Sequence, residues 1–300
     1  MHMVHRLLFA AFALSVSAFA CAETTTFERE VAADPHGMVE VSSTTGVIEV
    51  TGWDKPTVAV KAELGADVDR VDVTTSGNHT VVRVLLKSHI GLNWSHDETR
   101  LRVQVPKDSE LDASTVSGNL SSAGVVGTQR LKAVSGDIAA EIGPADIEAK
   151  SVSGNVKLRG HDQPARLHVS SVSGDVELKH AAGELETSTV SGEITVQLDP
   201  ARSVHARSTS GDMTFEGKLL RGADFDAQTV SGDIKLRAST EDGFEYEAQS
   251  LSGEISDCFN AAAERTSQYG PGHKLNGTRG AGSAHVRLKS MSGDLELCDH

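Results

Sequence analysis

The chain has 300 residues, of which 42 are Asp or Glu and 28 are Lys or Arg, so its formal net charge is −14. An acidic chain without a basic patch is not expected to bind nucleic acid or to dock electrostatically on anionic lipid. Aromatic residues make up only 4% of the chain while glycine occurs 28 times, which favours thin β-structure over a large ring-filled core.

Residues 1–22 are predicted to be a signal peptide. Arg6 precedes an apolar run, Leu7–Ala20, that is too short to span a bilayer. We expect cleavage after Ala22, so that the chain is exported to the periplasm or the outer cell surface. A lipid anchor at Cys21 fits poorly, because the residues before it depart from a lipoprotein box. No later segment is long and apolar enough to predict a transmembrane span.

Residues 23–110 are predicted to form a β-rich N-terminal region that joins and caps the rest. Alternation of apolar and polar residues predicts strands at Met38–Ser42, Gly46–Val50, Thr57–Ala62, Val68–Thr74, Thr80–Leu86 and Thr99–Val105. The pair Thr45-Gly46 is interpreted as a degenerate copy of the repeat described next. Trp53 and Trp94 are expected to be packing residues rather than a sugar-stacking platform.

Residues 111–300 carry a repeated motif, Ser-Gly followed by Asp, Asn or Glu. The copies begin at Ser117, Ser135, Ser153, Ser173, Ser191, Ser210, Ser231, Ser252 and Ser292, spaced 18 to 21 residues apart except for a last step of 40. Period-two alternation flanks each motif, and Gly with Asp or Asn suits a bend. We therefore predict an all-β fold, a β-solenoid (β-helix-like) of about nine two-strand coils. A propeller or sandwich is the alternative, but a propeller blade needs about 40 residues.

The residue after each Gly should form a column along the solenoid. Its members are Asn119, Asp137, Asn155, Asp175, Glu193, Asp212, Asp233, Glu254 and Asp294. We expect turn residues that face water. Stacked like charges repel, so Ca²⁺ is the one candidate cofactor for the seven carboxylates, although the sequence is not the Gly-Gly-x-Gly-x-Asp calcium repeat.

The residue before each Ser forms a second column. It contains Val116, Val134, Val152, Val172, Val190, Thr209, Val230, Leu251 and Met291. Strict alternation points these side chains outward. We expect the bend at Gly to turn them back into a packed corner instead. If they are exposed, the column is the best candidate for a partner-binding face.

Cys258 and Cys298 each lie six residues after the Ser of their motif. Equivalent positions of stacked coils lie about 4.8 Å apart, within reach of a disulfide, which we predict in place of two free thiols. The bracketed segment 258–298 is rich in Gly and Pro, so we expect a loop that caps the solenoid. His273, Lys274 and Arg279 make it locally basic and form a possible ligand site. Two Cys without a His pair are weak evidence for a metal site.

Catalysis is not expected. The histidines show no HExxH spacing, and Ser-Gly-Asp is not a Gly-x-Ser-x-Gly nucleophile elbow. A polysaccharide-active β-helix enzyme that uses the carboxylate column stays as an alternative.

Three features resemble a known family. They are the turn Gly52-Trp53-Asp54, the Val105-Pro106 pair before the array, and the tandem Val-Ser-Gly-Asp-(Ile/Val)-x-Leu units. Over residues 35–298 the chain resembles the bacterial putative-adhesin, or toastrack, family. The resemblance implies an exported β-repeat protein of the cell envelope, linked to adhesion or envelope-stress signalling, with no catalytic residues to transfer.

The sequence therefore leaves two main hypotheses for function. The first is a non-enzymatic adhesin or binding scaffold whose partner is a protein or a polysaccharide of the envelope. The second is an envelope-stress accessory that engages a membrane-bound partner.

Overall fold

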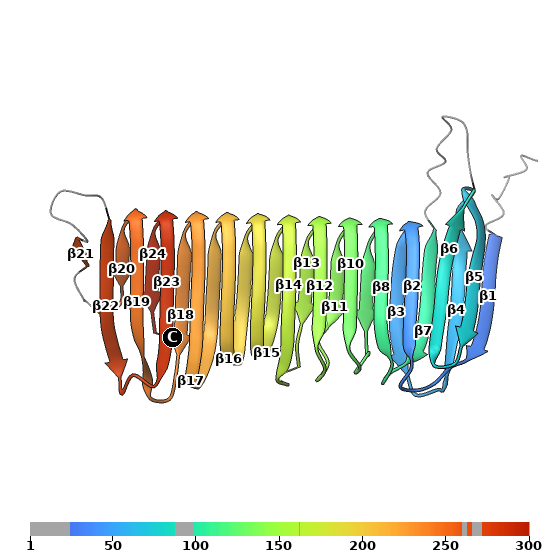
Figure 1. The fold of residues 1–300 in the computed structure, drawn as a ribbon, viewed down its shortest axis with the longest axis horizontal. Coiled ribbons are helices and arrows are strands. Elements are labelled where there is room, and N and C mark those ends of the chain that lie inside the picture. Colours follow the sequence, from blue (N-terminus) through green and yellow to red (C-terminus); the bar gives the residue numbers. More distant parts are fainter. Residues whose placement is uncertain (1–24, 88–98, 162, 260–262, 266–271, 300) are drawn as a thin grey trace, which may run out of the picture.

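The structure is a computed structural model that describes residues 25–87, 99–161, 163–259, 263–265 and 272–299. The predicted signal peptide, Cys21 and Trp94 lie outside the described residues. Within them the chain consists of strands joined by turns, which confirms the all-β, solenoid-like architecture (Figure 1). The described part of the chain contains no helix that could cross a membrane.

Seven strands precede the regular repeats. They are β1 (Thr25–Ala32), β2 (Met38–Thr45), β3 (Val47–Trp53), β4 (Thr57–Leu64), β5 (Val68–Ser76), β6 (His79–Leu86) and β7 (Arg100–Pro106). Six of them match the predicted stretches. β1 was missed, because most of its side chains are exposed and it has no clean alternation.

The repeat region contributes the remaining strands. They are β8 (Glu110–Ser117), β9 (Leu120–Ala123), β10 (Gln129–Ser135), β11 (Ile138–Glu141), β12 (Ile147–Ser153), β13 (Val156–Arg159), β14 (Ala165–Ser173), β15 (Val176–Ser191), β16 (Ile194–Ser210), β17 (Met213–Ser231), β18 (Ile234–Ser239), β19 (Gly243–Ser252), β20 (Ile255–Asp257), β21 (Glu264–Arg265), β22 (His273–Gly280), β23 (Ala284–Ser292) and β24 (Leu295–Cys298).

Successive coils pair in parallel and in register, Ser against Ser. Ser117 pairs with Ser135, and the same match continues coil by coil to Ser231. In Figure 1 the arrowheads of these strands line up along one long edge of the molecule. The strand before each Ser belongs to one layer and the strand after each Gly to the other, with Val, Ile, Leu, Ala and three Phe side chains buried between them.

The degenerate repeat at Thr45 continues the same parallel strand pairing. Thr45 pairs with Ser117, and Ile48 pairs with Leu120. The two layers then continue past β2 and β3, one through β6 and β5 and the other through β7, β4 and β1. Because this pair of strands is in register with the regular coils, the number of coils depends on where the array is said to begin.

Each coil bends at a position that only glycine can occupy. At seven of these positions the backbone φ lies between +141° and +158°, a region that other residues rarely adopt. A Cβ added to Gly232 would collide with the carbonyl oxygen of Gly211, and the same clash recurs from Gly136 to Gly293. The bends therefore stack backbone on backbone.

The column after the Gly forms a hydrogen-bond ladder. A side-chain oxygen of Asn119, Asp137, Asn155, Asp175, Asp212, Asp233 and Asp294 accepts the backbone N–H of the equivalent residue in the next coil, at 2.8–3.0 Å. Glu193 is the interior exception, and its longer side chain accepts from the Thr195 hydroxyl instead. Glu254 lies at the end of this ladder.

The last coil stacks out of sequence order. β23 pairs with β17 on one side and with β19 on the other, and β24 likewise lies between β18 and β20. Figure 1 shows β23 between β17 and β19. The coil 284–298 is thus inserted between two coils that precede it in the chain.

The disulfide joins Cys258 to Cys298, with their Cα atoms 5.0 Å apart. It links the ends of the inserted coil and its neighbour. The bracketed segment is not all loop, because β22 runs antiparallel to β19 and covers its outer edge. That strand accounts for the predicted cap in the described part of the segment.

Replacing Gly232 by Ala should lower the free energy of unfolding by about 3 kcal/mol, since the new Cβ meets both a forbidden φ and a carbonyl oxygen. Gly222→Ala is the control: φ is +74° there but no atom lies within 4 Å, so only about 1 kcal/mol should be lost. Denaturant unfolding would measure both variants. Equal losses would show that close stacking contributes nothing.

Asp137→Ala should destabilise the array by about 1 kcal/mol, because the Asn155 N–H loses its acceptor. Asp137→Asn keeps an acceptor and should be close to neutral. Hydrogen exchange at the Asn155 amide would report the change locally. An Asn variant that exchanges as fast as the Ala variant would contradict the ladder, since charge rather than the hydrogen bond would then matter.

Candidate functional site

A row of apolar side chains runs along the outside of the array. We call this row the ridge; in spatial order it contains Val116, Val134, Val152, Val172, Val190, Thr209, Val230, Met291 and Leu251. Its valines are 45–50% exposed and Met291 is 54% exposed. The expectation that these side chains turn into a packed corner was wrong.

The strand geometry explains the exposure. The residue two before each Ser is buried, for example Ser151 at 5% and Thr229 at 6% exposure. Because side chains alternate between faces, the next residue must point outward. The chain bends only at the Gly, two residues further on, which is too late to turn the ridge inward.

A polar row lies beside the ridge on the same face, three residues before each Ser. We call it the donor row; it contains Ser114, Lys132, Lys150, Ser170, Ser188, Arg207, Gln228, Lys289 and Gln249. No member is acidic, although Asp and Glu outnumber Lys and Arg by 42 to 28 in the chain. The row is not among the sites predicted from the sequence, although the residue three before each Ser shows it directly when the repeats are aligned.

Two shallow grooves follow the ridge and the donor row. The N-terminal groove, of about 540 Å³, includes Val116, Val134 and Val152 with Lys132 and Lys150. The C-terminal groove, of about 670 Å³, includes Val230, Leu251 and Met291 with Arg207 and Lys289. Neither groove is lined by any Asp or Glu.

The cations of the N-terminal groove are paired within the protein. Lys132 Nζ lies 3.7 Å from Asp112, and Lys150 contacts Glu148, where it holds the pKa of that carboxyl below its usual value. Arg83 donates to Glu40 at 2.8 Å. These charges stabilise the sheet and are only partly available to a ligand.

The cations of the C-terminal groove are not paired in this way. Arg207 is exposed, and neither it nor the half-buried Lys289 forms an ion pair or hydrogen bond with another described residue. Lys289 acts on Glu247 only at longer range, after Lys274 and Arg287, in lowering its pKa. Beneath the groove, the buried hydroxyls of Thr189, Ser208 and Thr229 also find no partner within the described protein.

The three residues of the predicted loop site separate in the structure. His273 lines the C-terminal groove, and its Nδ1 lies 3.0 Å from the Gly253 carbonyl oxygen. Lys274 pairs with Glu247 at 2.9 Å. Arg279 pairs with Asp299 at 2.9 Å and lies over the Phe259 ring, 5.2 Å from its centroid. All three lie on β22, and of the three only His273 lines the C-terminal groove.

The five Asp side chains of the carboxylate column are engaged in the hydrogen-bond ladder described above, whereas Glu193 and Glu254 accept no backbone N–H in it. The set comprises Asp137, Asp175, Glu193, Asp212, Asp233, Glu254 and Asp294. Among the described residues there is no group of three or more His, Cys, Asp or Glu side chains close enough to hold a metal ion. Binding of Ca²⁺ by this column stays a prediction.

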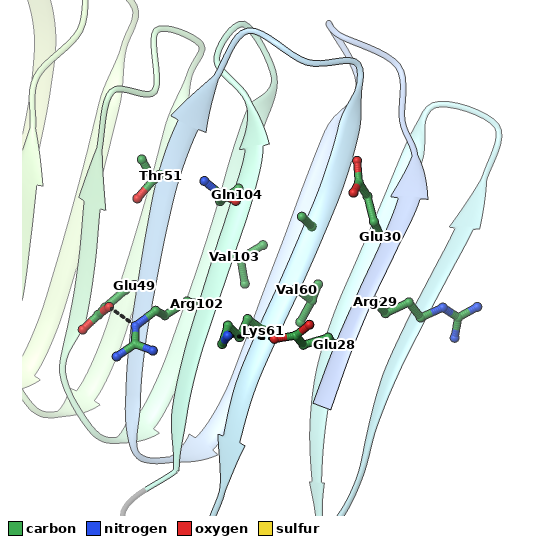
Figure 2. A pocket seen from close by; sticks show the side chains of 11 residues that line it. Glu28, Arg29, Glu30, Glu49, Thr51, Val60, Lys61, Arg102, Val103 and Gln104 are labelled. Atoms are coloured by element: carbon green, nitrogen blue, oxygen red, sulfur yellow. Dashed lines mark hydrogen bonds and ion pairs between the residues drawn. The ribbon is translucent and has the colours of Figure 1, made fainter. Parts of the chain in front are cut away.

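A third groove, of about 610 Å³, lies at the N-terminal end of the array across β1, β3, β4 and β7 (Figure 2). Arg102 donates to Glu49 at 3.1 Å and to Glu63 at 2.9 Å, and Lys61 contacts Glu28 at 2.7 Å. The hydrogen bonds that Arg102 donates to Glu63 and Glu49 raise its own pKa, and the hydrogen bond from Lys61 lowers the pKa of Glu28. The groove is therefore bridged by its own ion pairs.

Comparison with solved structures finds proteins of low identity. A putative lipid binding protein from Parabacteroides distasonis is 14% identical, covers 93% of this chain and 98% of its own, and has a TM-score of 0.45. A putative adhesin from the same species is 11% identical, covers 91% and 98%, and has a TM-score of 0.41. A putative adhesin from Bacteroides fragilis is 12% identical, covers 93% of this chain and 98% of its own, and has a TM-score of 0.38. These identities are too low to carry a function to this chain.

No curated protein matches the chain. A family model described as Toastrack DUF4097 matches residues 38–298, which run from the start of β2 to Cys298. This match confirms the resemblance drawn from the Gly-Trp-Asp turn and the tandem Ser-Gly-Asp units. The chain is a member of the Toastrack family.

Proposed function

We propose that this protein is a non-enzymatic binding scaffold of the bacterial cell envelope, an exported adhesin that engages its partner along the ridge. The ridge is the observation that carries this proposal. A line of eight half-exposed Val, Leu and Met side chains, interrupted by Thr209, is unusual on the surface of a soluble protein and supports an interaction site. Export to the envelope is supported by the signal peptide predicted at residues 1–22.

The energetics of the ridge fit a binding role. Complete burial of an exposed Val or Leu side chain is worth about 1.5–3 kcal/mol, so a half-exposed one offers roughly half of that to a partner. Several such contacts in one line supply an adhesive surface without a deep pocket. The regular spacing also lets one partner engage many equivalent side chains at once.

Substituting Thr for Val152, Val172 and Val190 tests the ridge. Thr keeps the β-branched shape and already occupies the ridge at Thr209, so the fold should be retained. We expect the triple variant to bind an isolated envelope fraction of the source bacterium at least about fivefold more weakly, because apolar contact is lost. Co-sedimentation would measure the binding.

A matched triple variant provides the control. Ala139→Thr, Arg159→Thr and Gln197→Thr alter three exposed positions of the other layer and should leave binding unchanged. Equal retention of the wild type and the ridge variant, with both folded by circular dichroism, would sink the ridge as the binding surface.

The location can be tested on intact cells. An adhesin of the outer surface should be cut by added protease before any permeabilisation, and immunodetection would show the fragments. Cutting only after the outer membrane is opened would place the chain in the periplasm. That result would contradict adhesion and favour the envelope-stress accessory instead.

A further inference from the structure

The C-terminal groove combines free cations with exposed apolar side chains. Arg207 and Lys289 stand in the donor row, beside Val230, Met291 and Leu251 of the ridge. No acidic side chain lines the groove. On a protein with a net charge of −14, this is a place where an added carboxylate gains attraction without displacing an internal partner.

Asp226 and Glu247, two residues before the Gln side chains that line the groove, are already engaged. Asp226 accepts from Gln228 at 2.6 Å and lies 3.5 Å from Arg287. Glu247 accepts from Gln249 at 2.7 Å and pairs with Lys274 at 2.9 Å. Arg207 and the half-buried Lys289 are therefore left without an acidic partner. Each Gln has donated one of its two side-chain N–H groups and still offers the other N–H and its Oε1.

This mixture of groups selects among anionic partners. Each Gln can both accept and donate a hydrogen bond, which matches the N–H and C=O groups of a peptide backbone better than a phosphate group, which only accepts. No Phe, Tyr or Trp lines the groove, so a sugar ring would find no large apolar ring to stack on. Aliphatic side chains of a peptide match Val230, Leu251 and the adaptable Met291. An acidic peptide fits all of these features.

The spacing of the cations suggests the conformation of that peptide. Arg207 is on β16 and Lys289 on β23, with β17 between them, so they are two strand spacings, or about 9.6 Å, apart. In a polyproline II helix, residues three apart lie on one face and are about 9.3 Å apart. Acidic residues at every third position would thus meet both cations.

We propose that the C-terminal groove binds an extended, acidic segment of a partner protein in the polyproline II conformation, with acidic residues three apart and aliphatic residues between them. This rests on the proposed function, since it names the partner chemistry of the same face. Arg207 and Lys289 hold the two carboxylates, and the ridge holds the aliphatic side chains.

The probe is a synthetic peptide that repeats Glu-Pro-Leu, added to the full exported chain and followed by fluorescence anisotropy. We expect saturable binding that weakens with added salt. Arg207→Ala with Lys289→Ala should weaken it roughly tenfold, since one exposed ion pair contributes up to about fivefold. Arg159→Ala with Lys235→Ala removes two exposed cations of the other layer and should change nothing.

Three results would overturn the proposal: no binding of the peptide, equal binding of a Lys-Pro-Leu repeat, or equal binding of a peptide with the same composition but clustered acids. Polygalacturonate and phosphatidylglycerol vesicles are tested in parallel. Binding of either one that depends on Arg207 and Lys289, without peptide binding, would identify a glycan or a lipid instead.

Failure of the peptide proposal can be distinguished from failure of the proposed scaffold function. If the envelope fraction still binds through Val152, Val172 and Val190 while the peptide does not bind, the scaffold function stands and the peptide proposal fails. If neither the envelope fraction nor the peptide binds, both fail.

Discussion

The structure depends on the stacking of glycine bends. Each coil places the carbonyl oxygen of its Gly where the Cβ of the next coil would lie. Coils can therefore approach to the spacing of paired strands at the bend, and Ser meets Ser in every pairing from Ser117 to Ser231. Once that register is fixed, every other position of the repeat becomes a column, either buried or exposed along the whole array.

The hydrogen-bond ladder after the Gly offsets the repulsion between the stacked carboxylates at the bend. A column of carboxylates should repel itself, yet each Asp or Asn accepts a backbone N–H from the next coil. Asn119 begins the column and Asn155 separates Asp137 from Asp175, which lowers the density of negative charge at this end. Acidic side chains are used in this way to build the array, which leaves the apolar ridge and the donor row as the face offered to partners.

The sequence was sufficient for everything that repeats. The period predicted the stacked strands, the alternation predicted the buried positions, and the equivalent places of Cys258 and Cys298 predicted their bond. The sequence was insufficient where two stacking orders of the coils would form the same Ser-to-Ser pairings. The coil at Ser292 offers identical pairing on either side of the coil at Ser252, so the motif could not reveal that it is inserted before that coil. The orientation of the ridge was misjudged because the bend was assumed to begin too early.

The insertion of the last coil also shapes the C-terminal groove. It brings Arg287 between β17 and β19, where Arg287 lies 3.5 Å from Asp226 and 3.6 Å from Glu247. In the N-terminal coils, acids five residues before the Ser pair with lysines of the donor row, as Glu148 does with Lys150. At the C-terminal end Arg287 takes that place, so Lys289 of the same strand has no acid left to bind. The inserted strand thus supplies both Arg287, which takes up the neighbouring acids, and Lys289, which is left without a close acidic partner.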